Sequence, residues 1–148
     1  MESQTQETGE GLESYLRVGG AVVFQPDPGH GAASRFNTQV RGWEKMKYVL
    51  LDRVSAGNER TLPVHENQPC AVRFVYEGKA CAFMTLVEDW NSRRDAGWVR
   101  VMWPKALEVV SFRKHERVRA GAPCTLSREG ALLGDGVVRD VSLGGCGI

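Results

Sequence analysis

Short runs in which apolar and polar residues alternate make up most of this chain from about residue 16 onward. In the clearest case the chain alternates over Cys70–Tyr76, turns at Glu77-Gly78 and returns over Ala80–Val87. A period of two is typical of β-strands, and two such runs joined by a two-residue turn predict a hairpin. Further short strands are predicted at Leu16–Gln25, Arg35–Trp43, Tyr48–Leu51, Gly97–Trp103 and Leu107–Val110.

This pattern predicts a mainly β protein whose N-terminal part is a small closed β-barrel, because about six short strands follow one another without a long amphipathic helix. Two later strands, Glu116–Leu126 and Ala131–Val141, are predicted on either side of a turn at Ser127–Gly130. The expected division is a disordered, polar tail at 1–14, a barrel domain at 15–110, a basic linker at 111–119 and a partial second domain at 120–148.

Composition and charge exclude several classes of partner. A formal charge of +1 over 148 residues provides no bulk attraction to a nucleic acid polymer or an anionic membrane. The first residues lack the basic start and apolar run of a signal peptide, and the chain has no apolar stretch of about 18 residues. We therefore expect a cytoplasmic protein that neither binds nucleic acid polymers nor inserts into membranes.

The sequence shows neither a metal site nor a catalytic motif. Because the cysteines have no zinc-ligand spacing, we expect buried, reduced thiols and no metal or other cofactor at Cys70, Cys81, Cys124 and Cys146. A P-loop, an HExxH motif and an ordered Ser/His/Asp set are all missing. The acidic pair Glu88-Asp89 lies at a predicted strand end, where neighbouring side chains point to opposite faces and share no site. We therefore expect a binding protein and not an enzyme.

The candidate chemistry lies in the last third of the chain. Arg113 and Arg117 are four residues apart at the start of a predicted strand, and Asp140, Ser142 and Gly145 follow at the end of the next one. A guanidinium group forms paired hydrogen bonds both with a phosphate and with the O6/N7 edge of guanine. The two motifs together predict a site for a small anion. The alternative is an ordinary solvated linker followed by an ordinary Asx turn.

The order RxxxR then DxSxxG resembles the signature of the PilZ domain, and the preceding hundred residues resemble the N-terminal domain of YcgR-like flagellar brake proteins. This resemblance implies a split-barrel-like N-terminal barrel followed by a partial PilZ β-barrel. It also implies a receptor for cyclic di-GMP, in which ligand binding at the arginine-rich linker rearranges the domains and regulates flagellar motility or surface behaviour. The implied protein partner is the flagellar motor or other motility or secretion machinery.

Each motif residue then has an expected contact with cyclic di-GMP. Arg113 and Arg117 would hold phosphates or guanine edges, with Lys114 and Arg119 as weaker additions. Asp140 would accept hydrogen bonds from N1 and N2 of guanine, and Ser142 would offer an adaptable hydroxyl. The backbone at Gly144 and Gly145 would approach the ligand closely, since glycine has no Cβ.

The PilZ part is expected to be cut short, because the chain stops at Ile148, three residues after the second motif. Open strand edges invite pairing with another chain, which predicts a homodimer. One alternative function is a protein-interaction domain that binds no nucleotide. Another is a flavin-binding split barrel with an aromatic rim, although barrel core or rim is the favoured place for the tryptophans, Trp43, Trp90, Trp98 and Trp103.

Overall fold

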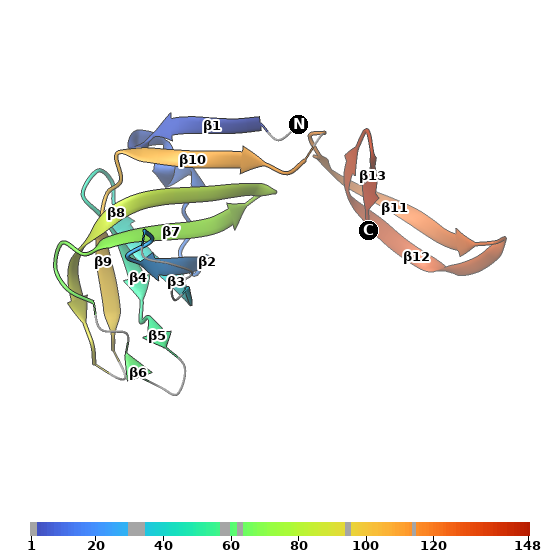
Figure 1. Ribbon diagram of the computed structural model, residues 1–148. Coiled ribbons are helices and arrows are strands. Elements are labelled where there is room, and N and C mark those ends of the chain that lie inside the picture. Colours follow the sequence, from blue (N-terminus) through green and yellow to red (C-terminus); the bar gives the residue numbers. More distant parts are fainter. Residues whose placement is uncertain (1–2, 30–34, 57–59, 62–63, 94–95, 114) are drawn as a thin grey trace. The chain divides into compact units, whose positions relative to one another are not determined.

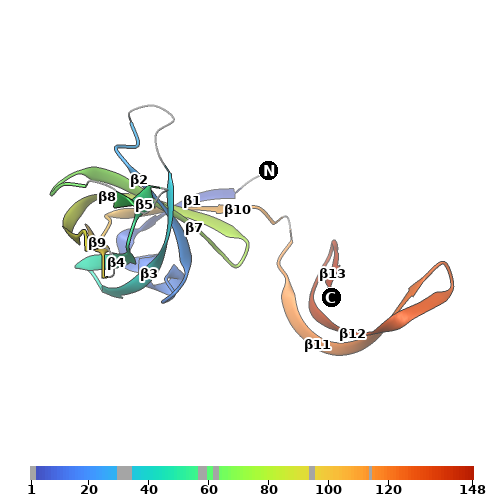
Figure 2. The same cartoon turned by 90° about the horizontal axis from the view of Figure 1, so that it is seen from below.

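The computed structural model describes residues 3–29, 35–56, 60–61, 64–93, 96–113 and 115–148. The chain divides into two compact units, residues 2–112 and residues 113–148. Both units are built from β-strands, so the prediction of a mainly β protein is confirmed (Figures 1 and 2). No helix among the described residues has the length and apolar character needed to cross a bilayer.

The first unit consists of short strands and one 3-10 helix in the described ranges. Its elements are β1 (Ser3–Thr8), η1 (Gly9–Tyr15), β2 (Ala21–Pro26), β3 (Phe36–Glu44), β4 (Tyr48–Asp52), β5 (Ser55–Ala56), β6 (Arg60–Thr61), β7 (Pro69–Tyr76), β8 (Lys79–Asn91), β9 (Trp98–Met102) and β10 (Ala106–Ser111). The β7–β8 hairpin is the one predicted from the alternating pattern, and its Glu77-Gly78 turn has positive φ at both residues, as a type I′ hairpin turn requires.

Six strands of the first unit close into a barrel. The order is β8-β7-β2-β3-β4-β9, and pairing of β9 with β8 completes the ring. Strand β8 is 13 residues long, which allows it to pair with two strands along one edge. Residues 79–82 pair with β10, and the section from Val87 to Asn91 pairs with β9. The predicted closed barrel is therefore confirmed, and β10 and β1 extend its sheet.

Alternate residues of the strands fill the barrel interior. Each fully buried side chain of this kind stabilises the fold by about 1.5–3 kcal/mol. Fully buried members include Phe24, Val49, Leu51, Val72, Val87, Val101 and Leu107. Among the tryptophans, Trp103 is buried, whereas Trp90 is 37% exposed.

Residues 3–14 belong to β1 and η1 in the structure, so the prediction of a disordered tail at 1–14 was wrong for these residues. All six residues of β1 pair with β10, from Ser3 opposite Ser111 to Thr8 opposite Ala106. An edge strand is held by backbone hydrogen bonds, which do not require apolar side chains. The polar composition of this segment therefore did not indicate that it forms a strand. The helix η1 then buries Leu12 completely in the barrel, and Trp103 Nε1 donates to Gly9 O at 2.7 Å.

The acidic pair at the end of β8 also differs from expectation. The register between β8 and β9 shifts between Val87 and Asp89, which marks a β-bulge. A bulge interrupts the strict alternation of faces. Both carboxylates therefore reach one guanidinium, with Arg100 Nε 2.8 Å from Glu88 Oε2 and Arg100 Nη2 3.6 Å from Asp89 Oδ2. The prediction that the two acids would not share a site was wrong, although the site they share is an ion pair.

Two of the four cysteines are buried as predicted, and one is not. Cys70 and Cys81 lie in the barrel core. Burial raises the pKa of the Cys70 thiol to about 12, with a smaller contribution from Asp27. Cys146 is exposed in the second unit and Cys124 is half-buried. The expectation of four buried thiols was therefore wrong for Cys124 and Cys146, because both lie in a single three-stranded sheet in which no described residue is buried.

Iodoacetamide at pH 8 is expected to alkylate Cys146 and to leave Cys70 unmodified in the folded protein. The reactive species is the thiolate, which is scarce at Cys70 because its pKa is about 12 and its sulfur is inaccessible. Mass spectrometry of tryptic peptides after a timed reaction measures both sites. Unfolding in urea should make Cys70 as reactive as Cys146, and fast labelling of Cys70 without urea would contradict the fold.

The second unit is a three-stranded antiparallel sheet. Strand β11 (Val118–Arg128) pairs with β12 (Ala131–Ser142), which pairs with β13 (Gly145–Gly147). The turn between β11 and β12 is Glu129-Gly130, and both residues have positive φ. In contrast to the barrel, none of the described residues of this unit is buried. The predicted strands and turn are present, and β13 was not predicted.

Candidate functional site

The arginines of the RxxxR motif lie in the irregular segment that precedes β11. Arg113 is exposed and Arg117 comes immediately before the first residue of the strand. Lys114, a predicted site residue, lies outside the described residues. His115 and Glu116 between the arginines are exposed, as expected for His115. This segment belongs to the second unit, so the whole candidate site can be described within one compact body.

A β-bulge determines which face of the sheet Arg119 occupies. Arg119 lies opposite Asp140, and Ala122 lies opposite Val138, so β11 has one more residue than β12 in this interval. Residues directly opposite in an antiparallel pair project to the same face. The extra residue keeps both Arg119 and Ala122 on the face of Asp140, whereas simple alternation would separate them. The bulge therefore adds a cationic side chain to the candidate site.

The DxSxxG motif spans the end of β12, a tight turn and the start of β13. Ser142 lies opposite Gly145, and Asp140 lies opposite Gly147, so all four positions share one face. Ser142 Oγ accepts a hydrogen bond from Gly144 N and donates one to Gly145 O, each at 3.3 Å. The side chain that forms the turn is thus Ser142 and not Asp140. Gly145 has φ +149°, in the region that favours glycine.

An ion pair joins the two motifs. Arg117 Nη1 donates to Asp140 Oδ1 at 3.1 Å, and the side chains are 43% and 29% exposed, respectively. A pair with this exposure contributes at most about 1 kcal/mol to stability, since water screens it. Breaking this contact to bind a ligand would therefore cost little free energy. It also places the cation and the acceptor where one small molecule could contact both.

Two residues not predicted for the site lie next to it. A Cβ atom on Gly147 would be 3.0 Å from Asp140 Oδ1 and 3.3 Å from Oδ2, so the glycine leaves the carboxylate unobstructed. A Cβ on Gly144 would lie 3.8 Å from His115 Cδ2, which places the imidazole beside the turn. The only signal in the sequence was that Gly147 continues a glycine-rich run, and a run of that kind does not specify a carboxylate neighbour.

The face therefore combines hydrogen-bond donors and acceptors that suit a nucleotide with an anionic group. Arg117 and Arg119 provide guanidinium donors, Asp140 provides an acceptor pair, and Ser142 provides a hydroxyl at the edge of an open turn. Arg113 lies four residues before Arg117 in the same exposed segment. The structure thus brings Arg117, Arg119, Asp140, Ser142, Gly144 and Gly145 together.

Comparison with known proteins places the barrel in a family. Residues 17–96, more than half of the chain, match the family model PilZNR, which is described as flagellar protein YcgR. The match lies within the first unit and ends before the arginine motif. A comparison with curated proteins found no match.

Two solved structures share the fold. One is Bacillus subtilis inhibitor of motility, MotI/DgrA, with 14% identity and a TM-score of 0.52 over 86% of this chain and 60% of that one. The other is K. pneumoniae MrkH in complex with c-di-GMP, with 14% identity and a TM-score of 0.55 over 97% of this chain and 62% of that one. The chain thus spans about 60% of the length of each structure.

Proposed function

Because the chain belongs to the family of the flagellar protein YcgR, we propose that it is a receptor for cyclic di-GMP. The ligand would bind at the face formed by Arg117, Arg119, Asp140 and Ser142, with Arg113 contributing from the preceding segment. The observation that carries the proposal is the ion pair between Arg117 and Asp140, since it joins two motifs that are 23 residues apart in sequence. The c-di-GMP complex of MrkH, which has a similar fold, supports this choice of ligand.

Binding requires an exchange of partners at Asp140. In the empty site its carboxylate accepts from Arg117. Guanine offers N1–H and N2–H₂ as two parallel donors, which adenine lacks, so a guanine base would replace the arginine at Asp140. Arg117 would then turn to a phosphate or to the O6/N7 edge of a guanine. The guanine base would thus replace Arg117 as the donor to Asp140. The phosphate or the guanine O6/N7 edge would replace Asp140 as the acceptor for Arg117.

A few such contacts provide enough binding free energy for micromolar affinity. A hydrogen bond to a charged group contributes roughly 1.5–3 kcal/mol. Micromolar affinity corresponds to about 8 kcal/mol after the costs of ordering are included. Several charge-assisted contacts from Arg113, Arg117, Arg119 and Asp140 therefore account for micromolar binding, provided that the exposed segment at 113–117 becomes ordered around the ligand.

The proposed output is a change in the arrangement of the two units. A basic segment lies where the chain passes from the barrel unit to the second unit. When the site is filled, Arg117 would leave Asp140 and the cations of this segment would surround the anion, which favours a different conformation of the connection. The output would be regulation of flagellar motility or surface behaviour through the motor or related machinery. No catalytic step is part of this proposal.

Isothermal titration of the full chain with cyclic di-GMP tests the proposal, with cyclic di-AMP as the control nucleotide. Heat from the guanine nucleotide alone is expected, with micromolar or tighter affinity. Equal heat from both nucleotides would mean that only the phosphates are bound and that Asp140 reads no base. Absence of heat with both would overturn the receptor function and favour a protein-interaction domain that binds no nucleotide.

Replacing Asp140 with asparagine is expected to weaken binding of cyclic di-GMP by about tenfold, the equivalent of one charge-assisted hydrogen bond. The amide loses one of the two acceptors that face guanine, so preference over cyclic di-AMP should fall in parallel. Titration of both nucleotides into D140N measures this. A variant with the same affinity and preference as wild type would exclude Asp140 from base recognition.

A further inference from the structure

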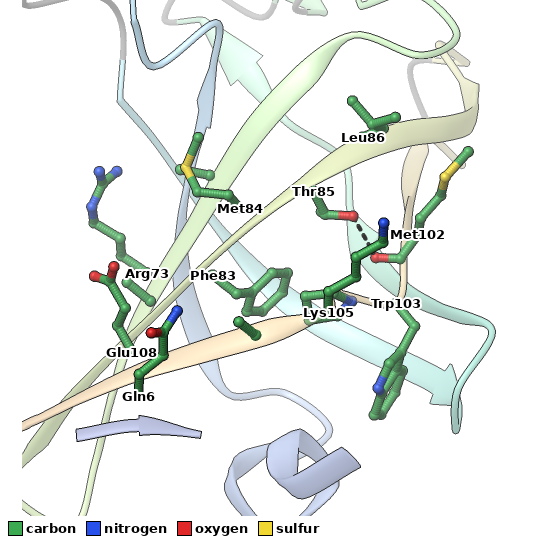
Figure 3. Close-up of a pocket in the computed structure, with 14 residues that line it drawn as sticks. Gln6, Arg73, Phe83, Met84, Thr85, Leu86, Met102, Trp103, Lys105 and Glu108 are labelled. Atoms are coloured by element: carbon green, nitrogen blue, oxygen red, sulfur yellow. Dashed lines mark hydrogen bonds between the residues drawn. The ribbon is translucent and has the colours of Figure 1, made fainter. Parts of the chain in front are cut away.

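A long trough crosses the outer face of the barrel unit, in the part of the sheet formed by β7, β8, β10 and β1. It consists of two adjoining hollows of about 640 and 330 Å³. Both are lined by Arg73, Ala82 and Glu108, so they are continuous along β8. Figure 3 shows the larger hollow, with Met84 and Leu86 extending from β8 and with Gln6 and Glu108 on the neighbouring strands.

The strand register explains why the surface is hollow there. Cross-strand rows place Ala82 between Arg73 on β7 and Glu108 on β10, and place Ala80 between Val75 and Val110. The alanines have only a methyl group, while their neighbours on both sides carry longer side chains. The floor of the trough is therefore β8. Side chains of β7 and β10 form its walls beside Ala80 and Ala82, and Met102–Lys105 line the larger hollow further along.

The length of the trough suits a short α-helix that rests its apolar face on the alanines of β8. From Ala80 to Leu86 the strand rises by roughly 20 Å. Beside Ala80 and Ala82, where β8 pairs with both neighbours, β7 and β10 are two strand spacings, about 9.6 Å, apart. A helix is about 10–12 Å across with its side chains, and about 13 residues of helix span 20 Å. An extended segment is less suitable, because Ala80 and Ala82 are already paired on both sides and offer no backbone hydrogen bonds to an added strand.

The lining combines exposed apolar side chains with charged side chains that have no ion-pair partner among the described residues, while Arg73 Nη1 donates a hydrogen bond to Gln25 Oε1. Val75 is 70% exposed and Met84 is 58% exposed, values that are high for side chains of this size. Methionine is common at surfaces that accept apolar helices. Lys105 and Glu108 form no ion pair within the described part of the chain, and no described carboxylate pairs with Arg73.

We propose that this trough is the docking site for an amphipathic α-helix of a partner protein. The apolar face of the helix would lie on Ala80 and Ala82, between Val75 and Met84. Acidic side chains on its flanks would face Lys105 and Arg73, and a basic side chain would face Glu108. This surface belongs to the barrel unit and the proposed nucleotide site belongs to the second unit, so the protein would carry an input site and a partner site on different units.

A displayed library of random 14-residue peptides tests the proposal. Peptides are selected on the full chain and then titrated into three proteins by fluorescence anisotropy. The first is wild type, the second is Ala82→Gln, which fills the trough with a neutral side chain, and the third is the matched control Ala131→Gln on the exposed end of β12. Cyclic di-GMP binding by Ala82→Gln is measured alongside, and wild-type affinity is expected because the substitution lies outside the nucleotide site.

The expected result is a set of helical peptides with an apolar stripe and acidic flanks. Their Kd should rise by about tenfold or more on Ala82→Gln, as for loss of a central anchor, and stay unchanged on Ala131→Gln. Lys105→Glu should weaken the same peptides, and replacing their acidic residue with lysine should restore binding. Selection of no common pattern, or of peptides that bind Ala82→Gln as well as wild type, would overturn the proposal. So would a dimer in light scattering that Ala82→Gln dissociates, because the trough would then accept a second copy.

Discussion

Replacement of Arg117 with alanine is expected to raise the Kd for cyclic di-GMP by about 100-fold or more. The guanidinium would make two charge-assisted hydrogen bonds to the ligand, each contributing roughly 1.5–3 kcal/mol, and alanine makes neither. The variant also leaves Asp140 without its present partner. Since the ion pair is partly exposed and contributes little to stability, the fold should be retained. Isothermal titration together with a thermal melt separates loss of binding from loss of structure.

The chain provides a matched control for this experiment. Arg139 is the neighbour of Asp140 on β12 and is exposed, and alternation along the strand places it on the opposite face. Arg139→Ala also removes one positive charge, but from a side chain that would not contact the ligand. Its only effect would be a screened, long-range electrostatic one, so the affinity should stay within about twofold of wild type. If both variants lost affinity equally, the effect would be one of net charge, and the assigned site would be wrong.

The second large effect is expected in the barrel. Leu12→Ala should lower the free energy of unfolding of the first unit by about 3 kcal/mol, because it empties the volume of a fully buried leucine. All four tryptophans belong to this unit, so tryptophan fluorescence in a urea titration reports its unfolding without interference from the second unit. The same measurement decides whether η1 is an integral part of the barrel.

Val18→Ala is the control, because Val18 lies six residues further along and is 71% exposed. This substitution removes a similar apolar group from a surface position and should change the stability by less than about 0.5 kcal/mol. Equal midpoints for wild type and Leu12→Ala would mean that the N-terminal segment is not part of the folded unit. Pairing of β1 with β10 would then also be in doubt.

Much of the fold follows from local patterns. The alternation at Cys70–Tyr76 and Ala80–Val87 predicted the central hairpin, because a strand with one buried face must repeat every two residues. The polar strand β1 could not be predicted in this way, since its place depends on backbone pairing with β10, a hundred residues later. The same limit applied to Glu88 and Asp89, where a bulge in the register brings two neighbouring carboxylates to Arg100.

By itself, the sequence determined which chemical groups are available to a ligand. The residue types and spacing of Arg113, Arg117, Asp140 and Ser142 predicted a site for a small anion, because those properties belong to the side chains. Only the tertiary structure decided their arrangement. The extra residue in β11 moved Arg119 onto the face of Asp140, and the β12–β13 pairing placed Gly147 beside the carboxylate. The trough on β8 likewise exists only in the folded sheet. Strand register sets these neighbours, and it depends on hydrogen bonds between segments distant in sequence.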